Sequence, residues 1–199
     1  MDAEIERIYI IELLMQCAYA WDVANTMSDI LNMPNSPEKI PRFFREAGYF
    51  LQHTSAISRL LWPAKTGSND LAKKRGSHLC EMLKVNEDHI LNKRHLRNHF
   101  EHIDERLDDW GQNSPHHNLV YESIGSRTNI RGDVITDKDV FRLFNPQTSI
   151  LSFRGEEYNV LDMVNGVRDI QSKAHERMRQ INILIEEEVM KRCGQHEDS

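Results

Sequence analysis

The chain has 199 residues, of which 28% are charged, and a formal net charge of -6 at pH 7. This length suits one domain that buries a full hydrophobic core without needing a disulfide or a metal ion for stability. The acidic balance excludes a protein that coats long stretches of nucleic-acid phosphate, so any contact with RNA must be local. We therefore expect a single domain over residues 1–199.

The cysteines and the apolar runs restrict the compartment. Cys17, Cys80 and Cys193 are far apart and form no C-x-x-C pair, so neither a zinc ribbon nor a disulfide framework is supported, and a reducing compartment is the default. No apolar run approaches the roughly 20 residues that span a bilayer. The acidic start, Met1–Glu4, also differs from the basic first region of a signal peptide. We predict a cytoplasmic protein that is not bound in a membrane.

A long helix is expected at the start of the chain, over residues 3–33. Its apolar residues recur mostly at three- and four-residue steps and would form one stripe: Ile10, Leu14, Cys17, Trp21, Ala24 and Leu31. Pro34 is expected to end this helix, because the residue before a proline is disfavoured in the helical conformation.

Two further helices are expected before residue 90. Ser36, with Pro37 at the next position, is predicted to cap a second helix that runs to about Leu61. A shorter helix is expected over residues 70–85. Gly76 weakens that prediction, because a glycine inside a helix costs about 1 kcal/mol relative to alanine.

A fourth helix is expected to contain the most informative part of the sequence and to end near Gly111. Its core stripe has apolar residues spaced four, three, four and three residues apart: Leu96, Phe100, Ile103, Leu107 and Trp110. On an ideal helix with about 100° per residue, Asn98 and His102 then lie on neighbouring positions of the outer face. Arg97 is about 140° from His102 on the same wheel, so one straight helix does not bring these two side chains together.

The helical pattern stops in residues 113–159, where short apolar runs predict strands. These runs are Leu119–Tyr121, Val140–Phe144 and Ile150–Phe153. Asn145–Thr148 is expected to form a turn between the last two runs. We therefore expect a small β-hairpin inserted into a helical protein.

A long final helix is expected after this insertion. Asn159 is predicted to cap it, with Asp162 in the first turn. Its apolar stripe is Val160, Val164, Val167, Ala174, Met178, Ile181 and Ile185. Residues 193–199 are polar after Cys193 and are expected to be a frayed tail.

One short motif in the fourth helix carries a family resemblance. An arginine, a polar residue, three further residues and a histidine occur as Arg97, Asn98 and His102. This pattern resembles the motif of HEPN domains, many of which are metal-independent ribonucleases. The resemblance implies an all-α helical bundle of about five helices, in which the β-hairpin is an insertion. It also implies a homodimer in which the three residues of both copies line one composite cleft for RNA.

These residue types suit cleavage of RNA by its own 2′-hydroxyl group. A histidine can act as base or acid near neutral pH, and an arginine can bind phosphate oxygens bidentately as charge builds there. Asn98 can orient the histidine or donate to the phosphate. Arg94 and His99 show the same spacing, but Asn98 favours the later pair. The expected products carry 2′,3′-cyclic phosphates, and no metal or other cofactor is expected.

A basic cluster precedes the motif. Lys93, Arg94 and His95 are expected to position the RNA backbone without reading its sequence. The earlier run Lys73–Arg75 is expected to be a solvated helix face instead. The family resemblance further implies a toxin–antitoxin or phage-defence setting, with an antitoxin as a protein partner.

Two alternatives remain open from the sequence. His95, His99 and His102 recur at steps of four and three residues, so neighbouring pairs of them can bind a metal ion. All three cannot bind one ion, since the outer two are about 10 Å apart along the helix axis. The competing class of function is a HEPN-like module that binds RNA or a protein partner without cutting.

Overall fold

The computed structural model describes residues 1–64, 69–93, 102–132 and 134–194. The helices of these residues are α1 (Ala3–Asn32), α2 (Lys39–Leu61), α3 (Asp70–Leu83), α5 (Ile103–Asn113) and α6 (Val160–Gly194). Short 3-10 helices are η1 (Ile90–Asn92), η2 (Arg127–Asn129) and η3 (Asp137–Asp139). The strands are β1 (Val120–Ile124), β2 (Val140–Asn145), β3 (Ile150–Phe153) and β4 (Glu156–Asn159).

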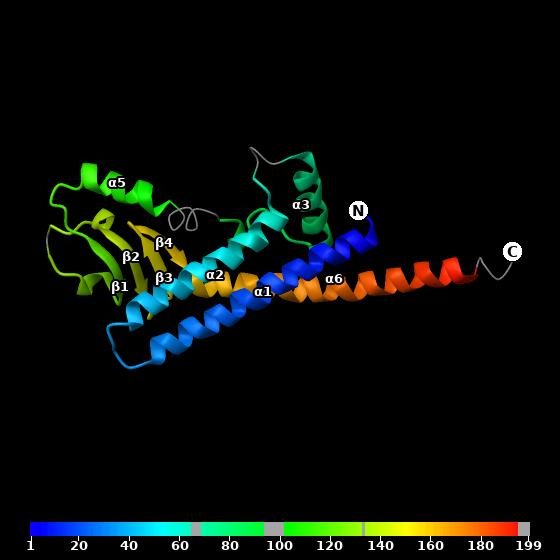
Figure 1. Ribbon diagram of the computed structural model, residues 1–199, viewed down its shortest axis with the longest axis horizontal. Coiled ribbons are helices and arrows are strands. Elements are labelled where there is room, and N and C mark those ends of the chain that lie inside the picture. Colours follow the sequence, from blue (N-terminus) through cyan, green and yellow to red (C-terminus); the bar gives the residue numbers. More distant parts are fainter. Residues whose placement is uncertain (65–68, 94–101, 133, 195–199) are drawn as a thin grey trace.

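The molecule is elongated, with a helical end and a sheet end (Figure 1). Helix α1 packs along both α2 and α6. Helix α3 lies near the start of α1, whereas α5 and the sheet lie at the opposite end of the molecule. The N-terminal turn of α1 and the last turns of α6 are at the helical end.

The first helix confirms the prediction from apolar periodicity. It begins where the Asp2 side chain accepts a hydrogen bond from the Glu4 backbone N–H at 2.8 Å, and it ends at Asn32. Its buried face contains one charged residue among apolar ones: Glu6, Ile10, Leu13, Cys17, Ala20, Met27 and Ile30. Three- and four-residue steps of this kind bury one face of a helix against its neighbours.

The start of α2 differs from the prediction. The helix begins at Lys39 rather than directly after Ser36, and its N-cap residue, Glu38, makes no capping hydrogen bond with its side chain. The Ser36 carbonyl oxygen instead accepts from the Lys39 backbone N–H at 3.1 Å, in a turn before the helix. The predicted end at Leu61 is confirmed.

Gly76 lies inside α3 at the point where this helix packs closely on the end of α2. Asn69 caps α3 by accepting from the Ala72 backbone N–H at 2.8 Å. A Cβ atom at Gly76 would lie 2.5 Å from Pro63 Cδ and 2.7 Å from the Leu61 carbonyl oxygen. Such a Cβ would overlap both atoms, so glycine lets α3 approach the end of α2.

The sheet corrects the predicted fold class. It has four strands in the order β1-β2-β3-β4, with β1 parallel to β2 and the other pairs antiparallel. The ring centroids of Phe144 in β2 and Phe43 in α2 are 4.6 Å apart, and Phe141 and Phe153 belong to the same buried core as the helices. The prediction of an all-α bundle with a small inserted hairpin is therefore wrong, and the fold is mixed α/β.

The hairpin between β2 and β3 was predicted, and its turn is confirmed. Asn145 pairs with Ile150, and the Asn145 side chain accepts from the Gln147 backbone N–H at 3.1 Å. Strand β4 was not predicted. It pairs with β3 in a register that joins Phe153 to Glu156.

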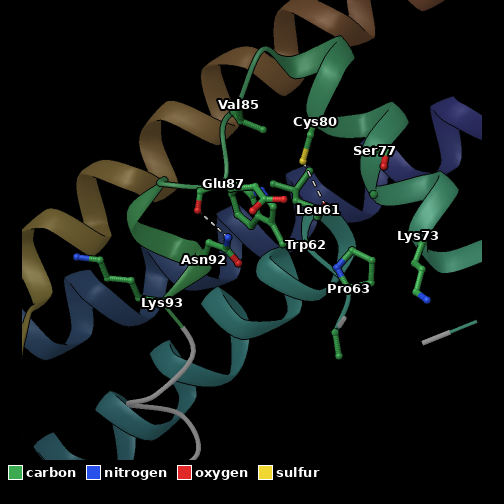
Figure 2. Close-up of a pocket in the computed structure, with 12 residues that line it drawn as sticks. Leu61, Trp62, Pro63, Lys73, Ser77, Cys80, Val85, Glu87, Asn92 and Lys93 are labelled. Carbon is green, nitrogen blue, oxygen red and sulfur yellow. Dashed lines mark hydrogen bonds between the residues drawn. The ribbon is translucent and has the colours of Figure 1, made fainter. Parts of the chain in front are cut away.

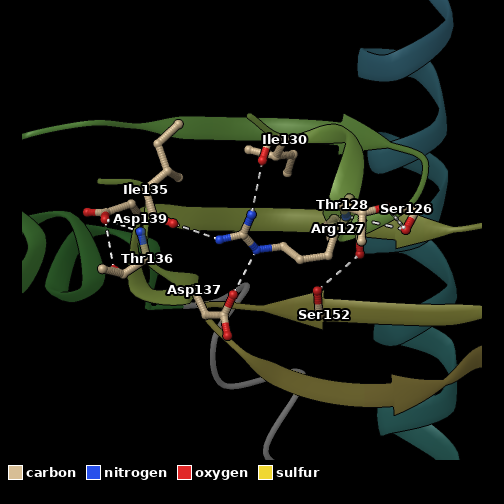
Figure 3. Close-up of polar contacts among 10 residues, drawn as sticks. Ser126, Arg127, Thr128, Ile130, Ile135, Thr136, Asp137, Asp139 and Ser152 are labelled. Carbon is tan, nitrogen blue, oxygen red and sulfur yellow. Dashed lines mark hydrogen bonds and ion pairs between the residues drawn. The ribbon is translucent and has the colours of Figure 1, made fainter. Parts of the chain in front are cut away.

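The connection from β1 to β2 is ordered by one arginine rather than by an α-helix. Figure 3 shows Arg127 at the centre of this connection. Its guanidinium donates to the Ile135 carbonyl at 2.8 Å and to the Ile130 carbonyl at 3.4 Å, and it pairs with Asp137 at 2.7 Å. These bonds hold the connection against the residues that precede β2.

The last helix begins as predicted. The Asn159 side chain accepts from the Asp162 backbone N–H at 3.1 Å. The helix extends to Gly194, so the first two residues of the predicted tail are helical, and residues 195–199 lie outside the described part of the chain. Gly166 allows η1 to pack closely on α6, because a Cβ atom there would lie 2.5 Å from Ile90 Cγ2.

Candidate functional site

His102 lies at the start of α5 and not inside a longer helix. It is the N-cap residue, with φ -110° and ψ 44°, and the α-helix begins at Ile103. Because this backbone conformation is not helical, the prediction of one continuous helix from Leu96 to Gly111 is wrong at His102. The angles between the side chains of Asn98 and His102 on an ideal helix therefore no longer apply.

The imidazole of His102 is accessible to a ligand. Its side chain is 52% exposed, and its Nδ1 atom is 3.5 Å from a carboxylate oxygen of Glu105. The carboxylate is also exposed, so solvent weakens the attraction between the two groups. A hydrogen on Nδ1 that points toward Glu105 leaves Nε2 as the nitrogen that can exchange a proton with a ligand.

The structure describes only some of the other residues of the predicted site. Arg97 and Asn98 lie outside the described residues, as do Arg94 and His95 of the basic cluster. Lys93 is described, is exposed, and lines a cleft beside η1. The structure thus places His102 and Lys93 at the two ends of the segment that carries the motif.

The metal alternative also depends on this segment. His95 and His99 lie outside the described residues, so the predicted histidine pairs stay untested. Within the part of the chain that the structure describes, no group of three or more histidine, cysteine, aspartate or glutamate side chains could hold a metal ion.

Arg154 fixes α5, and with it His102, on the sheet. Its guanidinium donates to the Arg106 carbonyl of α5 at 3.1 Å and to the Lys138 carbonyl before β2 at 3.0 Å. It also forms an ion pair with Asp109 of α5 at 2.7 Å. Only 11% of the Arg154 side chain is exposed, so its bonds to the two carbonyls are shielded from water and hold the helix, whereas Asp109 is exposed to solvent.

The apolar side of α5 was predicted correctly. Ile103, Leu107 and Trp110 are partly buried and pack against the hydrophobic core. The Trp110 indole N–H donates to the Asn118 carbonyl at 3.1 Å. The opposite side of α5 carries exposed acidic residues, which include Asp104 and Asp108.

A cleft lies beside the described end of the basic cluster (Figure 2). It has a volume of about 720 Å³ and is formed by the end of α2, one face of α3 and the residues around η1. Residues from these three elements line it, and they include Trp62, Pro63, Lys73, Ser77, Asn92 and Lys93. Lys73 is exposed on α3, as predicted for a solvated face, and it also lines this cleft, which no sequence pattern indicated.

A buried polar cluster joins α1, α3 and α6. Glu6 accepts from the Arg177 guanidinium at 2.6 and 3.0 Å, and His78 Nε2 is 3.0 Å from the same carboxylate. Burial alone would raise the pKa of Glu6, but hydrogen bonds from Arg177 and His78 outweigh it and leave this pKa below its ordinary value. The bidentate geometry and the burial indicate a clamp between helices. The sequence offered one signal for it, a glutamate in the apolar stripe of α1.

A second histidine is held by its neighbours. His89 accepts from the Leu91 backbone N–H at 3.3 Å, stacks on Trp62 with ring centroids 5.3 Å apart, and lies 3.5 Å from Asp169. Burial lowers the pKa of His89, although Asp169 opposes this effect. Nδ1 of His89 already accepts a hydrogen bond, and Nε2 faces Asp169 of α6. His89 therefore connects α6 to the start of η1.

The two described cysteines do not suit nucleophilic chemistry. Burial raises the pKa of Cys17 to about 12. Burial and the nearby charge of Glu87 raise the pKa of Cys80 to about 11, and its Sγ atom contacts the Leu61 carbonyl at 3.2 Å. Both groups remain thiols near neutral pH, which excludes an activated thiolate at these positions.

Comparisons with known proteins add no family. No protein-family model matches this sequence, and no curated protein or solved structure matches it either. The described part of the chain contains no helix with the length and apolar character needed to cross a membrane.

Proposed function

We propose that this protein is a metal-independent endoribonuclease that cleaves RNA by attack of its own 2′-hydroxyl. The observation that carries the proposal is the motif of Arg97, Asn98 and His102, whose histidine is exposed at the start of a helix held on the sheet. The resemblance to HEPN ribonucleases now rests on this motif alone, since the fold is mixed α/β.

Each residue has a chemical role in this proposal. His102 exchanges the proton of the nucleophile or of the leaving group, which contributes roughly 10²- to 10⁴-fold in rate. Arg97 stabilises the charge that develops on the phosphate, and Asn98 orients the histidine or the phosphate. Lys93, with Arg94 and His95 outside the described residues, holds the RNA backbone.

The test is cleavage of total cellular RNA in EDTA by purified protein. The wild type should produce fragments with 2′,3′-cyclic phosphate ends, and Arg97→Ala and His102→Ala should each lose roughly 10²-fold or more of the rate. His116→Ala is the matched control, because His116 is another exposed histidine and lies past the end of α5. Equal activity of all three variants would exclude the proposed site.

We also propose a homodimer, for which α1 offers a candidate face. Five large apolar side chains of α1, each at least 42% exposed, recur at steps of three, three, four and four residues: Ile5, Ile8, Ile11, Met15 and Tyr19. On the helical wheel this stripe is about 150° from the buried face of α1. Exposed apolar stripes of this length typically mark an interaction surface, and a second copy offers the same stripe about a two-fold axis.

The oligomeric state can be tested with a charge in this stripe. Sedimentation should show a dimer for the wild type and a monomer for Ile8→Glu. Leu161→Glu is the control, since Leu161 is a similarly exposed apolar residue at the sheet end of α6. A monomeric wild type would contradict the dimer.

The activity of the Ile8→Glu monomer distinguishes a site formed by one chain from a composite site formed by two chains. Helix α5 is at the opposite end of the molecule from the start of α1 (Figure 1). A dimer through α1 therefore leaves each site within one chain, and the monomer should keep its activity. Loss of cleavage together with the dimer would favour the composite site that the HEPN resemblance implies.

A second candidate function is a module that binds a protein partner without cutting RNA. The observation that favours it is the acidic surface next to His102, which includes Asp104, Glu105 and Asp108 and repels phosphate. In that case His102→Ala would change neither partner binding nor any cellular toxicity. A toxin–antitoxin or phage-defence setting and an antitoxin partner belong to the ribonuclease proposal and rest on the same resemblance. A cytoplasmic location is also part of the proposal and rests on the pattern of cysteines and apolar runs in the sequence.

A further inference from the structure

The cleft beside η1 has the dimensions of a ligand site. Its volume of about 720 Å³ lies within the usual range for small-molecule pockets. Trp62 and Pro63, from the end of α2, and Val85, before η1, give it an apolar wall. Flat aromatic groups such as nucleobases pack favourably against an apolar wall of this kind.

One polar group in this wall lacks a partner. Trp62 is 7% exposed, and its indole Nε1 donor has no hydrogen-bond partner among the described residues. A buried donor without an acceptor costs roughly 1–3 kcal/mol. The Nε1 atom itself is enclosed by the protein, so a base in the cleft packs against the accessible part of the Trp62 side chain and does not reach this donor.

The mouth of the cleft is charged on both sides. Lys73 of α3 and Lys93 after η1 lie on opposite sides of it (Figure 2). Glu87, Ser77 and Asn92 also line the cleft, so it contains one carboxylate besides the two ammonium groups. Two separated ammonium groups suit a ligand with negative charge at both ends. A nucleotide inside a strand has this form, because a phosphate lies on each side of its base.

We propose that this cleft binds one nucleotide of a single-stranded RNA, with its base against Trp62 and its flanking phosphates against Lys73 and Lys93. The inference rests on the proposed ribonuclease function and specifies its substrate. Lys93 precedes Arg97 by four positions in the chain, so the cleft adjoins the motif in the sequence.

The test uses an RNA that cannot be cleaved. A fluorescent hexanucleotide with 2′-O-methyl groups lacks the nucleophile, so its anisotropy in EDTA measures binding alone. Lys73→Glu should weaken binding about tenfold, and Lys74→Glu, the same charge change at the next exposed position outside the cleft, by less than about twofold. Lys73→Gln should reduce the slope of log affinity against log salt by about 0.7.

A second variant blocks the cleft without changing charge. Ser77 is exposed on α3 and lines the cleft, so Ser77→Trp should fill it and weaken binding while the thermal midpoint stays within a few degrees of the wild type. Equal weakening by Lys73→Glu and Lys74→Glu, or unchanged binding by Ser77→Trp, would overturn the inference.

The binding and cleavage assays fail independently. If the wild type cuts RNA and Lys73→Glu binds as tightly as Lys74→Glu, the ribonuclease proposal is supported and the nucleotide-binding cleft is contradicted. If only Lys73→Glu loses binding and no protein cuts RNA, the nucleotide-binding cleft is supported and the ribonuclease proposal is contradicted. Tight binding of free nucleoside monophosphates in place of the hexanucleotide would also overturn the assignment to an RNA strand.

Discussion

Arg177 at the helical end of the molecule and Arg154 at the sheet end are both largely buried, with 16% and 11% of their side chains exposed. Arg177 donates twice to the carboxylate of Glu6. Arg154 donates to two backbone carbonyls and pairs with Asp109. The first arginine thus depends mainly on one side chain, and the second depends mainly on the main chain.

This difference decides how each end can be disrupted. A backbone carbonyl is present whatever residue stands at its position, so no single substitution of a partner strips Arg154 of its acceptors. One substitution at Glu6 leaves Arg177 and His78 facing a buried space without the carboxylate. Substitution of the acceptor, Glu6, should therefore disrupt the helical end most. Substitution of the donor, Arg154, should disrupt the sheet end most.

The largest effect is expected for Glu6→Ala. Removing one partner of a buried ion pair costs roughly 3–5 kcal/mol, because the remaining charge is left uncompensated. The free energy of unfolding in urea should fall by this amount. The double variant Glu6→Leu with Arg177→Met is the control and should regain most of the loss, since an apolar pair leaves no unpaired charge.

A smaller loss is expected for Arg154→Ala. It removes the donor from two carbonyls and from Asp109, at a cost of about 2–3 kcal/mol. Hydrogen exchange should rise first in the backbone amides of α5, because Arg154 connects that helix to the sheet. Unchanged protection of α5 would show that its apolar side, not the guanidinium, fixes it.

The pH dependence should separate the two ends further. The pKa of Glu6 in the folded protein is below its ordinary value of 4.5, so its ion pair stabilises the fold fully above that value and less as pH falls through the folded pKa. The difference in unfolding free energy between wild type and Glu6→Ala should therefore shrink in acid. A difference that stays constant from pH 7 to pH 3 would contradict this assignment.

The smallest effect is expected for Asp109→Ala at the sheet end. Asp109 is exposed to solvent, and solvent screening leaves exposed ion pairs with little effect on stability. Arg154 keeps both carbonyl acceptors in this variant. If Asp109→Ala destabilised the protein as much as Glu6→Ala, the contrast between the two ends would be lost.

The long helices could be predicted from the sequence because many residues repeat the same signal. The bounds of α1 agree with the expected residues 3–33 to within one residue at its end, and the Asn159 cap of α6 is confirmed. Both helices bury one face over many turns, and apolar periodicity over such lengths outweighs local exceptions.

The sheet could not be predicted fully because its edge strand β4 carries little apolar signal. Strand β4 has the sequence Glu-Glu-Tyr-Asn and exists because it pairs with β3 after a tight turn. Arg154 and Gly155 in that turn have φ values of 49° and 88°, a pattern typical of two-residue hairpins. The parallel pairing of β1 with β2 requires a crossover connection, and the contacts of Arg127 within that connection have no local pattern that indicates them.

The backbone conformation at the candidate site could not be predicted from the sequence. The apolar spacing from Leu96 to Trp110 is regular, so it conceals the non-helical backbone of His102. Periodicity reports which side chains are buried and says little about one residue's φ and ψ angles. The clamp on Glu6 shows the converse, since a charged residue on an apolar stripe signals a buried partner without naming it.

The ion pair between Glu6 and Arg177 joins residues that are 171 positions apart in the chain. During synthesis Glu6 leaves the ribosome well before Arg177 does. We expect α1 to pair early with α2, its neighbour in sequence, while its α6-facing side stays open to chaperones until α6 has emerged. The contact between α1 and α6 should therefore form later than the contact between α1 and α2.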